Sequence, residues 1–320
     1  MARRIGEFEL IARYFAPLAK GFGGARGLKS DNAFLAADAR HDLVVKTDTI
    51  VAGVHFLANE KSELVAARAL RACLSDLAAG GAKPFAYQLS LSLGKGWSER
   101  WVAGFARGLA ADQRRYRIAM SGGDTTGSPG PTTVTITAFG KVACGKGLGR
   151  DGAQAGDEIW VSGTIGDAAL GLLVARRRLN GVALEKRYRL PQPRTDFGPR
   201  LIGIASATAD VSDGLLADAG HIAEASRLAL YIERDHVPLS ADARRAVRSD
   251  PSLWANVLGG GDDYELVIAV SPRKRAPLLA AARAAGVKIA CIGVFRPGNG
   301  VHLTVGGRET RVSRKGYVHF

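Results

Sequence analysis

Two stretches of this chain place apolar residues at every second position, and this pattern restricts the possible folds most strongly. They cover residues 87–93 and 132–142. A period of two is typical of strands that bury one face and expose the other. Segments with helical spacing lie before and between them. Half-buried strands mixed with helices favour mixed sheets, so we expect an α+β (mixed α/β) fold rather than a purely parallel stack.

The remaining elements follow from the same periodicities. An amphipathic helix is expected over 7–18, and Ser62 can cap a second helix that runs to about Ala79. Further helices are expected over 99–111, from Asp167, near 198–207, over 214–226 and over 272–285. Further strands are expected over 42–46, into Met120, and over 158–161, 228–233, 265–270 and 288–294.

The chain has 320 residues, and that length favours two domains over a single core. A glycine-rich stretch, Gly145–Gly156, interrupts the pattern near the middle. We therefore expect an N-terminal domain over 1–148 and a C-terminal α/β domain over 149–320.

Composition excludes several classes of protein. No stretch approaches the roughly 20 apolar residues that span a bilayer, so we expect no membrane partner and a cytoplasmic protein. The three cysteines are far apart, which disfavours zinc sites and disulfide frameworks. The net charge of +14 suits anionic ligands, but no dense Lys/Arg run is interleaved with aromatic residues. We therefore expect phosphorylated small molecules rather than nucleic acid.

Two familiar phosphate loops nearly occur, and both fail. Residues 140–147 read GKVACGKG, with Gly147 in place of the Ser or Thr that would hold Mg²⁺ in a P-loop. Residues 147–152 read GLGRDG but lead into a strand, whereas the dinucleotide fingerprint requires a helix. If the protein binds a nucleotide, it must do so with a different kind of binding site.

Aspartates beside small residues at the ends of apolar elements offer such a site. Each alone is also typical of a turn or a helix cap, and Asp213 before Gly214 could simply cap the next helix. Asp76 differs because it lies within a strongly apolar helix, where a lone buried charge is unfavourable. Converging carboxylates would require cations, and oxygen ligands favour Mg²⁺. The set is Asp31, Asp48, Asp76, Asp124, Asp210 and Asp213.

Other segments could serve the same site. Gly122 and Gly123 allow the backbone to approach a phosphate, and Arg150 could pair with one or be a solvated loop residue. Residues 259–266 place three glycines before two acids and then enter a strand, although a tight turn would explain the glycines alone. His55, between Val54 and Phe56, is more typical of a core histidine than of a ligand.

These segments together resemble the thiamine-monophosphate kinase family, within the group that includes aminoimidazole ribonucleotide synthetase and selenophosphate synthetase. The similarity runs from residues 6–13 (GEFELIAR) to 316–320 (GYVHF). Each motif alone is weak, and their order and spacing are specific. Between those ends stand 47–56 (TDTIVAGVHF), 74–79 (LSDLAA), 122–126 (GGDTT), 161–163 (VSG), 210–215 (DVSDGL) and 260–266 (GGDDYEL).

The resemblance implies a homodimer in which the N-terminal domains, residues 1–148, bind ATP and Mg²⁺ and dimerise, so that their sheets complete a barrel. It also implies that the enzyme phosphorylates thiamine phosphate in a reaction that depends on ATP and Mg²⁺. It implies catalytic roles for Asp48, Asp76, Asp124 and Asp213. It implies several Mg²⁺ ions held by Asp31, Thr47, Asp48, Asp76, Asp124, Asp210 and Asp213. ATP would contact Gly123, Asp124, Arg150 and Ser212, and thiamine phosphate would contact His55, Asp262 and Tyr317.

Three positions depart from the family pattern. Asn32 stands where a second Asp is usual, Lys46 where a small Ser or Thr is usual, and Cys73 where Asn is frequent. Lys46 brings a positive charge to the predicted metal cluster, and the sequence does not fix whether it points toward the aspartates. Two alternatives stay open: another ATP-using enzyme of the same group, and a non-catalytic nucleotide or nucleic-acid binder.

Overall fold

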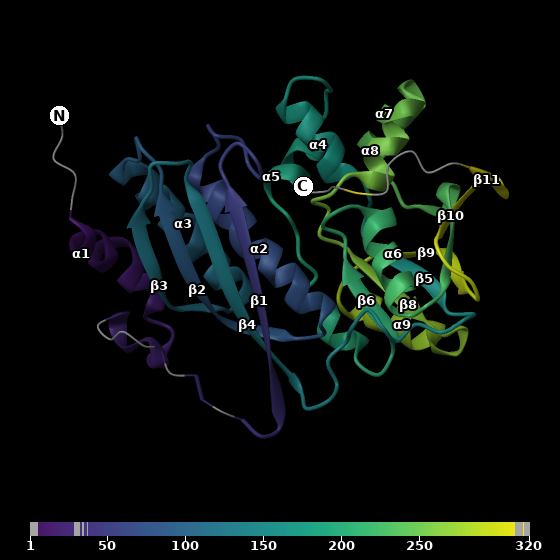
Figure 1. The fold of residues 1–320 in the computed structure, drawn as a ribbon, viewed down its shortest axis with the longest axis horizontal. Helices are drawn as coiled ribbons and strands as arrows, with labels where there is room; N and C mark the ends of the chain where they lie inside the picture. Colours follow the sequence, from purple (N-terminus) through teal and green to yellow (C-terminus); the bar gives the residue numbers. More distant parts are fainter. Residues whose placement is uncertain (1–5, 29–32, 34, 37, 311–315, 317–320) are drawn as a thin grey trace. The chain divides into compact units, whose positions relative to one another are not determined.

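The computed structural model describes residues 6–28, 33, 35–36, 38–310 and 316, and the chain divides into two compact units (Figure 1). Unit 1 comprises residues 1–77 and 83–144, and unit 2 comprises residues 78–82 and 145–320. The change of unit near residue 145 coincides with the start of the glycine-rich stretch. Among the described residues, no helix combines the length and the apolar character that crossing a bilayer would require.

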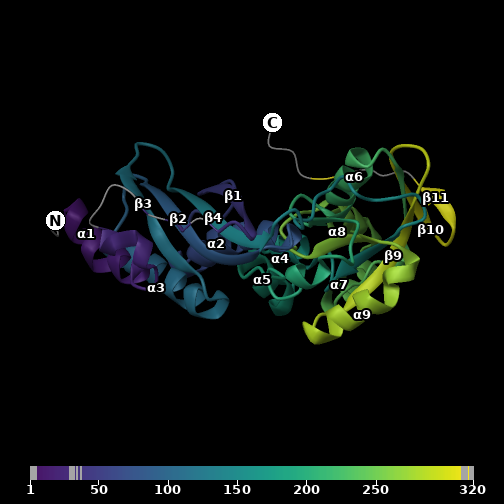
Figure 2. The same ribbon diagram turned by 90° about the horizontal axis from the view of Figure 1, so that it is seen from below.

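Unit 1 is built on a four-stranded sheet in the order β1-β4-β2-β3. β1 pairs antiparallel with β4 and β4 with β2, whereas β2 and β3 run parallel. The parallel pair is possible because a helix, α3, connects the two strands. Figure 2 shows α2 and α3 below one face of the sheet. The bounds are β1 His41–Val51, α2 Ser62–Ala79, β2 Lys83–Leu93, α3 Glu99–Tyr116, β3 Ala119–Gly127 and β4 Thr133–Ala143.

Close helix packing on that face depends on one glycine and one ion pair. A Cβ at Gly108 would lie 2.6 Å from the Glu63 carbonyl oxygen, so only glycine lets α3 approach α2 here. The Arg71 guanidinium on α2 donates from Nε and Nη2 to the two carboxylate oxygens of Asp112 on α3, at 2.8 and 2.7 Å. Both residues are buried, and this two-bond geometry fixes how the helices meet.

The N-terminal segment differs from the single amphipathic helix expected over 7–18. A short helix, α1 (Glu7–Leu10), continues as a π-helical turn, Ile11–Phe15, and as 3₁₀ turns, Ala16–Ala19 and Gly23–Leu28. Pro17 stands in the first turn of Ala16–Ala19. Its ring removes a backbone donor and disturbs the regular α-helical pattern, and the following glycines favour turns.

Unit 2 is built on a seven-stranded sheet in the order β11-β10-β7-β9-β5-β8-β6. β10 and β7 are parallel, and the other neighbours are antiparallel. Its strands are β5 Glu158–Ser162, β6 Ala207–Asp210, β7 Ala229–Glu233, β8 Leu266–Val270, β9 Ile289–Arg296, β10 Val301–Val305 and β11 Arg308–Thr310. Its helices are α4 Asp167–Ala175, α5 Val182–Arg189, α6 Leu215–Ala225, α7 Ala241–Ser249, α8 Trp254–Gly259 and α9 Arg275–Ala284.

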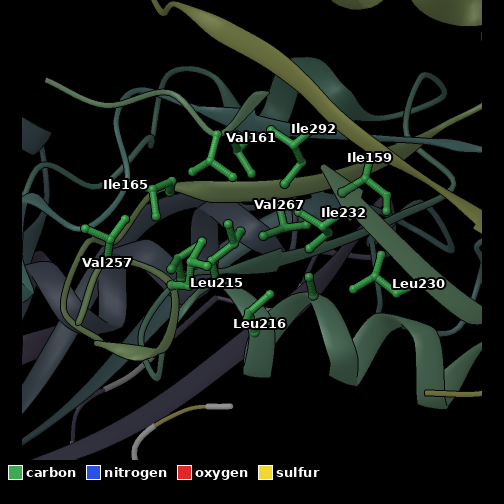
Figure 3. Packing of buried hydrophobic residues seen from close by; sticks show 14 of the residues in the cluster. Ile159, Val161, Ile165, Leu215, Leu216, Leu230, Ile232, Val257, Val267 and Ile292 are labelled. Carbon is green, nitrogen blue, oxygen red and sulfur yellow. The ribbon is translucent and has the colours of Figure 1, made fainter. Parts of the chain in front are cut away.

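Both faces of this sheet are covered. In β8, Val267 and Ala269 join a core with α4, α6, α7 and α8, part of which Figure 3 shows. Ile268 and Val270 point to the opposite face and pack with Leu278 of α9. Every residue of β8 is buried, as expected for a central strand with helices on both sides. The mixed two-domain architecture is therefore confirmed.

Candidate functional site

In unit 1, two of the predicted ligands are brought together by a strand and a helix. Lys46 and Asp48 are two positions apart on β1, so their side chains share a face, and α2 brings Asp76 to that face. Lys46 Nζ lies 3.1 Å from Asp48 Oδ1 and 3.0 Å from Asp76 Oδ1. Lys46 thus points into the predicted metal cluster and bridges the two carboxylates.

The electrostatics of this group favour a protonated lysine and a protonated thiol. Burial alone would lower the pKa of Lys46, but attraction to Asp76 and Asp48 raises it above its ordinary value. Burial is the main cause that raises the pKa of the Cys73 thiol, and the two carboxylates add to it. The Cys73 thiol lies 3.6 Å from Asp48 Oδ2. Both Lys46 and Cys73, two of the departures from the family pattern, therefore contact the Asp48 carboxylate.

Asp124 lies on the opposite face of the same sheet. The register places Asp124 opposite Ser90 and Ser90 opposite Thr135, whereas Asp48 faces the buried Ile136. Asp124 borders a cavity of about 560 Å³ whose other lining residues include Ile11, Phe15, Gln88, Gly122, Gly123 and Thr137. A Cβ at Gly123 would lie 1.9 Å from the Leu89 carbonyl oxygen, so the glycine permits the close β2–β3 pairing.

In unit 2, the segment after β6 wraps around a single buried carboxylate. The backbone N–H groups of Ser212, Asp213 and Gly214 donate to Asp218 Oδ2 at 3.0, 2.9 and 3.1 Å. Asp218 lies in the first turn of α6 and is 1% exposed. Because these three donors are already used, Ser212 can contact a ligand through its hydroxyl or carbonyl but not through its N–H. Sequence reasoning missed Asp218; its only signal is an acid within an apolar helical run.

The charges of Arg150 and Asp213 both act on the Asp218 carboxyl group. Burial raises the pKa of Asp218 to about 7, the Asp213 charge also raises it, and the Arg150 charge lowers it. The Ser226 hydroxyl donates to the Arg150 carbonyl oxygen at 3.1 Å. Asp210 lies buried at the end of β6 and enters the same segment.

The glycine-rich acidic segment packs against this loop. The Asp262 N–H donates to the Ser212 carbonyl at 2.8 Å, and the Tyr264 hydroxyl donates to Asp262 Oδ1 at 3.2 Å. A Cβ at Gly261 would lie 2.0 Å from the Ser212 carbonyl oxygen. The structure therefore brings Ser212, Asp213 and Asp262 together, and it explains one glycine of the motif by close backbone contact.

The other two acids of that segment have structural partners. Asp263 accepts the backbone N–H groups of Gly166 and Ala168 at the start of α4, at 2.5 and 3.0 Å, and burial raises its pKa to about 8. Glu265 is fully buried and pairs with Arg187 at 2.7 Å and with Arg194. These roles were not predicted from the sequence. Asp263 holds the start of α4, and Glu265 holds two arginines, so neither acid is positioned mainly to bind a ligand.

The remaining predicted residues are placed differently. Thr47 lies on the open face of β1 with its hydroxyl 2.9 Å from the Thr137 hydroxyl, and so points away from Asp48. His55 accepts the Val51 N–H on Nδ1 at 3.1 Å in the turn after β1. Asp31, Asn32 and Tyr317 lie outside the described residues. Gly316 lies beside α6, where a Cβ would be 2.4 Å from Ala217 Cβ and 3.1 Å from the Asp213 carbonyl oxygen.

The chemistry of these donors fits Mg²⁺ better than a softer metal. The candidates are carboxylates, and the Cys73 thiol is kept protonated and therefore is a poor ligand. Within the described residues, no three His, Cys, Asp or Glu side chains are grouped to hold a metal ion. In unit 1, Asp48 and Asp76 are joined by an ammonium group instead.

Comparison with known proteins identifies relatives over almost the whole length. The family model "AIR synthase related protein, N-terminal domain" matches residues 29–142, and the corresponding C-terminal domain model matches residues 154–306. The thiamine-monophosphate kinase of Caulobacter vibrioides is 42% identical over 318 residues, which cover 98% of this chain and 90% of that protein.

Solved structures give the same result. The thiamine-monophosphate kinase of Stenotrophomonas maltophilia K279a has a TM-score of 0.80 and 40% identity, covering 88% of this chain and 91% of that one. AaThiL complexed with AMPPCP and TMP has a TM-score of 0.77 and 29% identity, covering 100% of both chains. The motifs, the two-unit fold and these relatives agree, and the chain belongs to the thiamine-monophosphate kinase family.

Proposed function

We propose that this chain transfers the γ-phosphoryl group of ATP to thiamine phosphate and forms thiamine diphosphate. The observation that carries the proposal is its full-length similarity to AaThiL, which was solved with AMPPCP and TMP. AMPPCP is an ATP analogue, so that relative binds both a nucleotide and the phosphorylated acceptor. The residues that the motif match assigns to these ligands are present in this chain.

The acidic residues of both units would hold Mg²⁺. The proposed ligands are Asp31, Thr47, Asp48, Asp76, Asp124, Asp210 and Asp213, with Asp48, Asp76, Asp124 and Asp213 as the catalytic set. When bound, Mg²⁺ would neutralise phosphate charge and orient the two phosphates. The side chain of Thr47 points away from Asp48. Thr47 could therefore bind a metal ion at the Asp48 side of the strand only through its main-chain carbonyl oxygen.

The chain's own residues would bind and orient the substrates. Gly123 and Asp124 border the cavity on the open face of the unit 1 sheet. In unit 2, Ser212 donates its N–H to Asp218, and the charge of Arg150 acts on the same carboxyl group. We assign these four to ATP. His55, Asp262 and Tyr317 are assigned to thiamine phosphate, and Gly316 lies next to the Asp213 carbonyl group.

The reaction needs no strong general base. A phosphate monoester oxygen is largely anionic near neutral pH, so it can attack without first losing a proton to the protein. We infer direct in-line transfer, in which positioning and charge neutralisation supply much of the rate. A non-catalytic nucleotide-binding role is the second candidate, because Lys46 already offsets part of the negative charge of Asp48 and Asp76.

A second copy of the chain would cover the open face of β1. Leu43 and Val45 on this edge strand are 51% and 53% exposed. We infer that they become buried in a cytoplasmic homodimer, as the family resemblance implies. Leu43→Lys should shift the mass measured by light scattering to that of a monomer, because a charge would enter an apolar contact. Val182→Lys, at an 84% exposed apolar residue of α5, is the matched control and should leave the mass unchanged.

The activity is tested by incubating the purified protein with ATP, Mg²⁺ and thiamine phosphate and measuring thiamine diphosphate by chromatography. We expect product that depends on all three reagents. Asp48→Asn and Asp76→Asn should each reduce turnover by at least about 100-fold, because charge neutralisation at the phosphates would be lost. Asp235→Asn, at an exposed acid of unit 2, serves as the control. Absence of product from folded protein that binds ATP would favour the second candidate.

A further inference from the structure

Lys46 places an ammonium group between two carboxylates of unit 1 that the family resemblance assigns to Mg²⁺. Its ammonium lies between two carboxylates on different elements, at 3.1 Å from Asp48 Oδ1 and 3.0 Å from Asp76 Oδ1. Because the two distances are nearly equal, Lys46 bridges Asp48 and Asp76 rather than pairing only with Asp48 on its own strand. All three side chains are partly exposed, at 34%, 29% and 24%, so solvent and ions can reach the group.

The two oxygens that Lys46 contacts are the same atoms that a bridging metal would need. Mg²⁺ requires oxygen ligands at about 2.0–2.1 Å and tolerates little distortion. An ammonium group donates hydrogen bonds to oxygens at N···O distances of about 2.7–3.2 Å, so it satisfies the present spacing without drawing the carboxylates closer. A divalent ion placed between them would also meet the positive charge of Lys46 at short range.

The second oxygen of Asp48 offers no easy alternative. The Cys73 thiol lies 3.6 Å from Asp48 Oδ2 and 3.3 Å from the Ile136 carbonyl oxygen. Cys73 is fully buried within α2, so it cannot move away without disturbing the helix–sheet contact. Asp48 is thereby held between a cation on its own strand and a neutral group on the helix.

We propose that the Lys46 ammonium permanently replaces one divalent cation between Asp48 and Asp76, so that this chain binds one divalent ion fewer than the same chain with an uncharged residue at position 46. This inference rests on the proposed function, because it takes Asp48 and Asp76 as members of the metal-binding set. Lys46 is then a positioning residue that sets the spacing of two ligands, and it does not touch the transferred phosphoryl group.

The test is the number of Mn²⁺ ions bound per chain, measured by electron paramagnetic resonance with saturating AMPPCP. Lys46→Thr and Lys46→Met remove the charge, and each should bind one more ion per chain than the unmodified protein. Lys46→Arg keeps a cation that can span both carboxylates and should bind the unmodified number. Lys95→Met removes a charge from an exposed position of unit 1 and should also leave the number unchanged.

Equal numbers for the unmodified protein and both uncharged variants would overturn the proposal, since they would show that Lys46 moves aside when metal binds. An additional bound ion in Lys46→Arg would also overturn the proposal, because this variant keeps the positive charge.

Thermal unfolding provides a second readout that does not depend on nucleotide. Lys46→Met leaves Asp48 and Asp76 facing each other without a cation, so its melting temperature in EDTA should fall. Added Mg²⁺ should then raise that temperature more than it raises that of the unmodified protein. Equal responses to Mg²⁺ would contradict the proposal.

Both readouts are separate from the assay for thiamine diphosphate. If the unmodified protein forms no product but the ion count rises in Lys46→Thr, the cation replacement stands and the proposed function fails. If product forms and the ion count does not change, the proposed function stands and the cation replacement fails.

Discussion

The two units hold their acidic residues in different ways. In unit 1, Asp48 and Asp76 are 29% and 24% exposed and share one flexible cation, Lys46. In unit 2, Asp218 and Glu265 are 1% and 0% exposed and are held by backbone N–H groups or by two arginines. Partly exposed carboxylates can be reached by ions and ligands from solvent, whereas buried ones shape the backbone. The comparison thus distinguishes acids that are accessible to ligands from acids that hold the backbone and helices of unit 2 in place.

The largest effect is expected where a buried charge loses its counter-charge. Glu265→Gln would leave Arg187 and Arg194, which are only 16% and 20% exposed, facing a neutral group. Breaking a buried pair typically costs about 3–5 kcal/mol, and we expect a loss of this size in the free energy of unfolding measured by urea denaturation. Glu185→Gln breaks a half-exposed i,i+4 pair with Arg189 in the same unit and should cost about 0.5 kcal/mol or less. Similar losses in the two variants would show that burial does not distinguish these acids.

A smaller effect is expected at the loop before α6. Asp218→Ala leaves the N–H groups of Ser212, Asp213 and Gly214 without their present acceptor, which should lower the free energy of unfolding by about 1–3 kcal/mol. All three N–H groups donate to one oxygen, and an amide oxygen can replace it. Asp218→Asn should therefore lose less than half as much, and it should bind AMPPCP more tightly than Asp218→Ala when both are measured by calorimetry. Equal losses in the two variants would contradict a role as hydrogen-bond acceptor.

The sequence predicted several parts of the fold whose period is visible along the chain, but the amphipathic helix α7 was missed, as were α5, α8 and β10. The alternating segments correspond to β2 and β4, and the helix predicted from Ser62 to about Ala79 is α2. The helix predicted near 198–207 was wrong: a 3₁₀ turn, Gly198–Leu201, is followed by β6, whose four residues are all buried and show no alternation. β11 was missed because its three residues are exposed and carry no pattern.

For the site, local sequence identified candidates but not their partners. Asp76 was singled out as an unusual acid within an apolar helix; the structure places it in α2, partly exposed and paired with Lys46. The bridge from Lys46 to Asp76 joins a strand to a helix 30 positions away, and no local pattern reports such a contact. Asp263 was missed for the same reason, since the Gly166 N–H group that it accepts lies far away in the sequence. Asp218 accepts N–H groups from the residues directly before its helix, so its contact is local, but the apolar helical pattern does not indicate that this acid binds them.

The smallest effect is expected at an exposed acid–base pair of unit 2. Because this pair lies in the same unit as Glu265 but is exposed, it tests whether burial or location in unit 2 decides how much an acid stabilises the fold. His302 Nδ1 lies 2.7 Å from Glu309 Oε1, and the hydrogen bond to Glu309 is the main cause that raises the pKa of His302. The unfolded pKa of histidine is about 6.5, so the pair stabilises the fold fully below that pH and loses its contribution as the pH rises through the higher folded value. Glu309 is 65% exposed, so salt screening should limit the gain to about 0.5 kcal/mol. Comparing the free energies of unfolding of the unmodified protein and Glu309→Gln should show this difference at about pH 5.5 and none at about pH 9. A gap as large as that of Glu265→Gln would mean that position in unit 2, and not burial, decides how much an acid stabilises the fold.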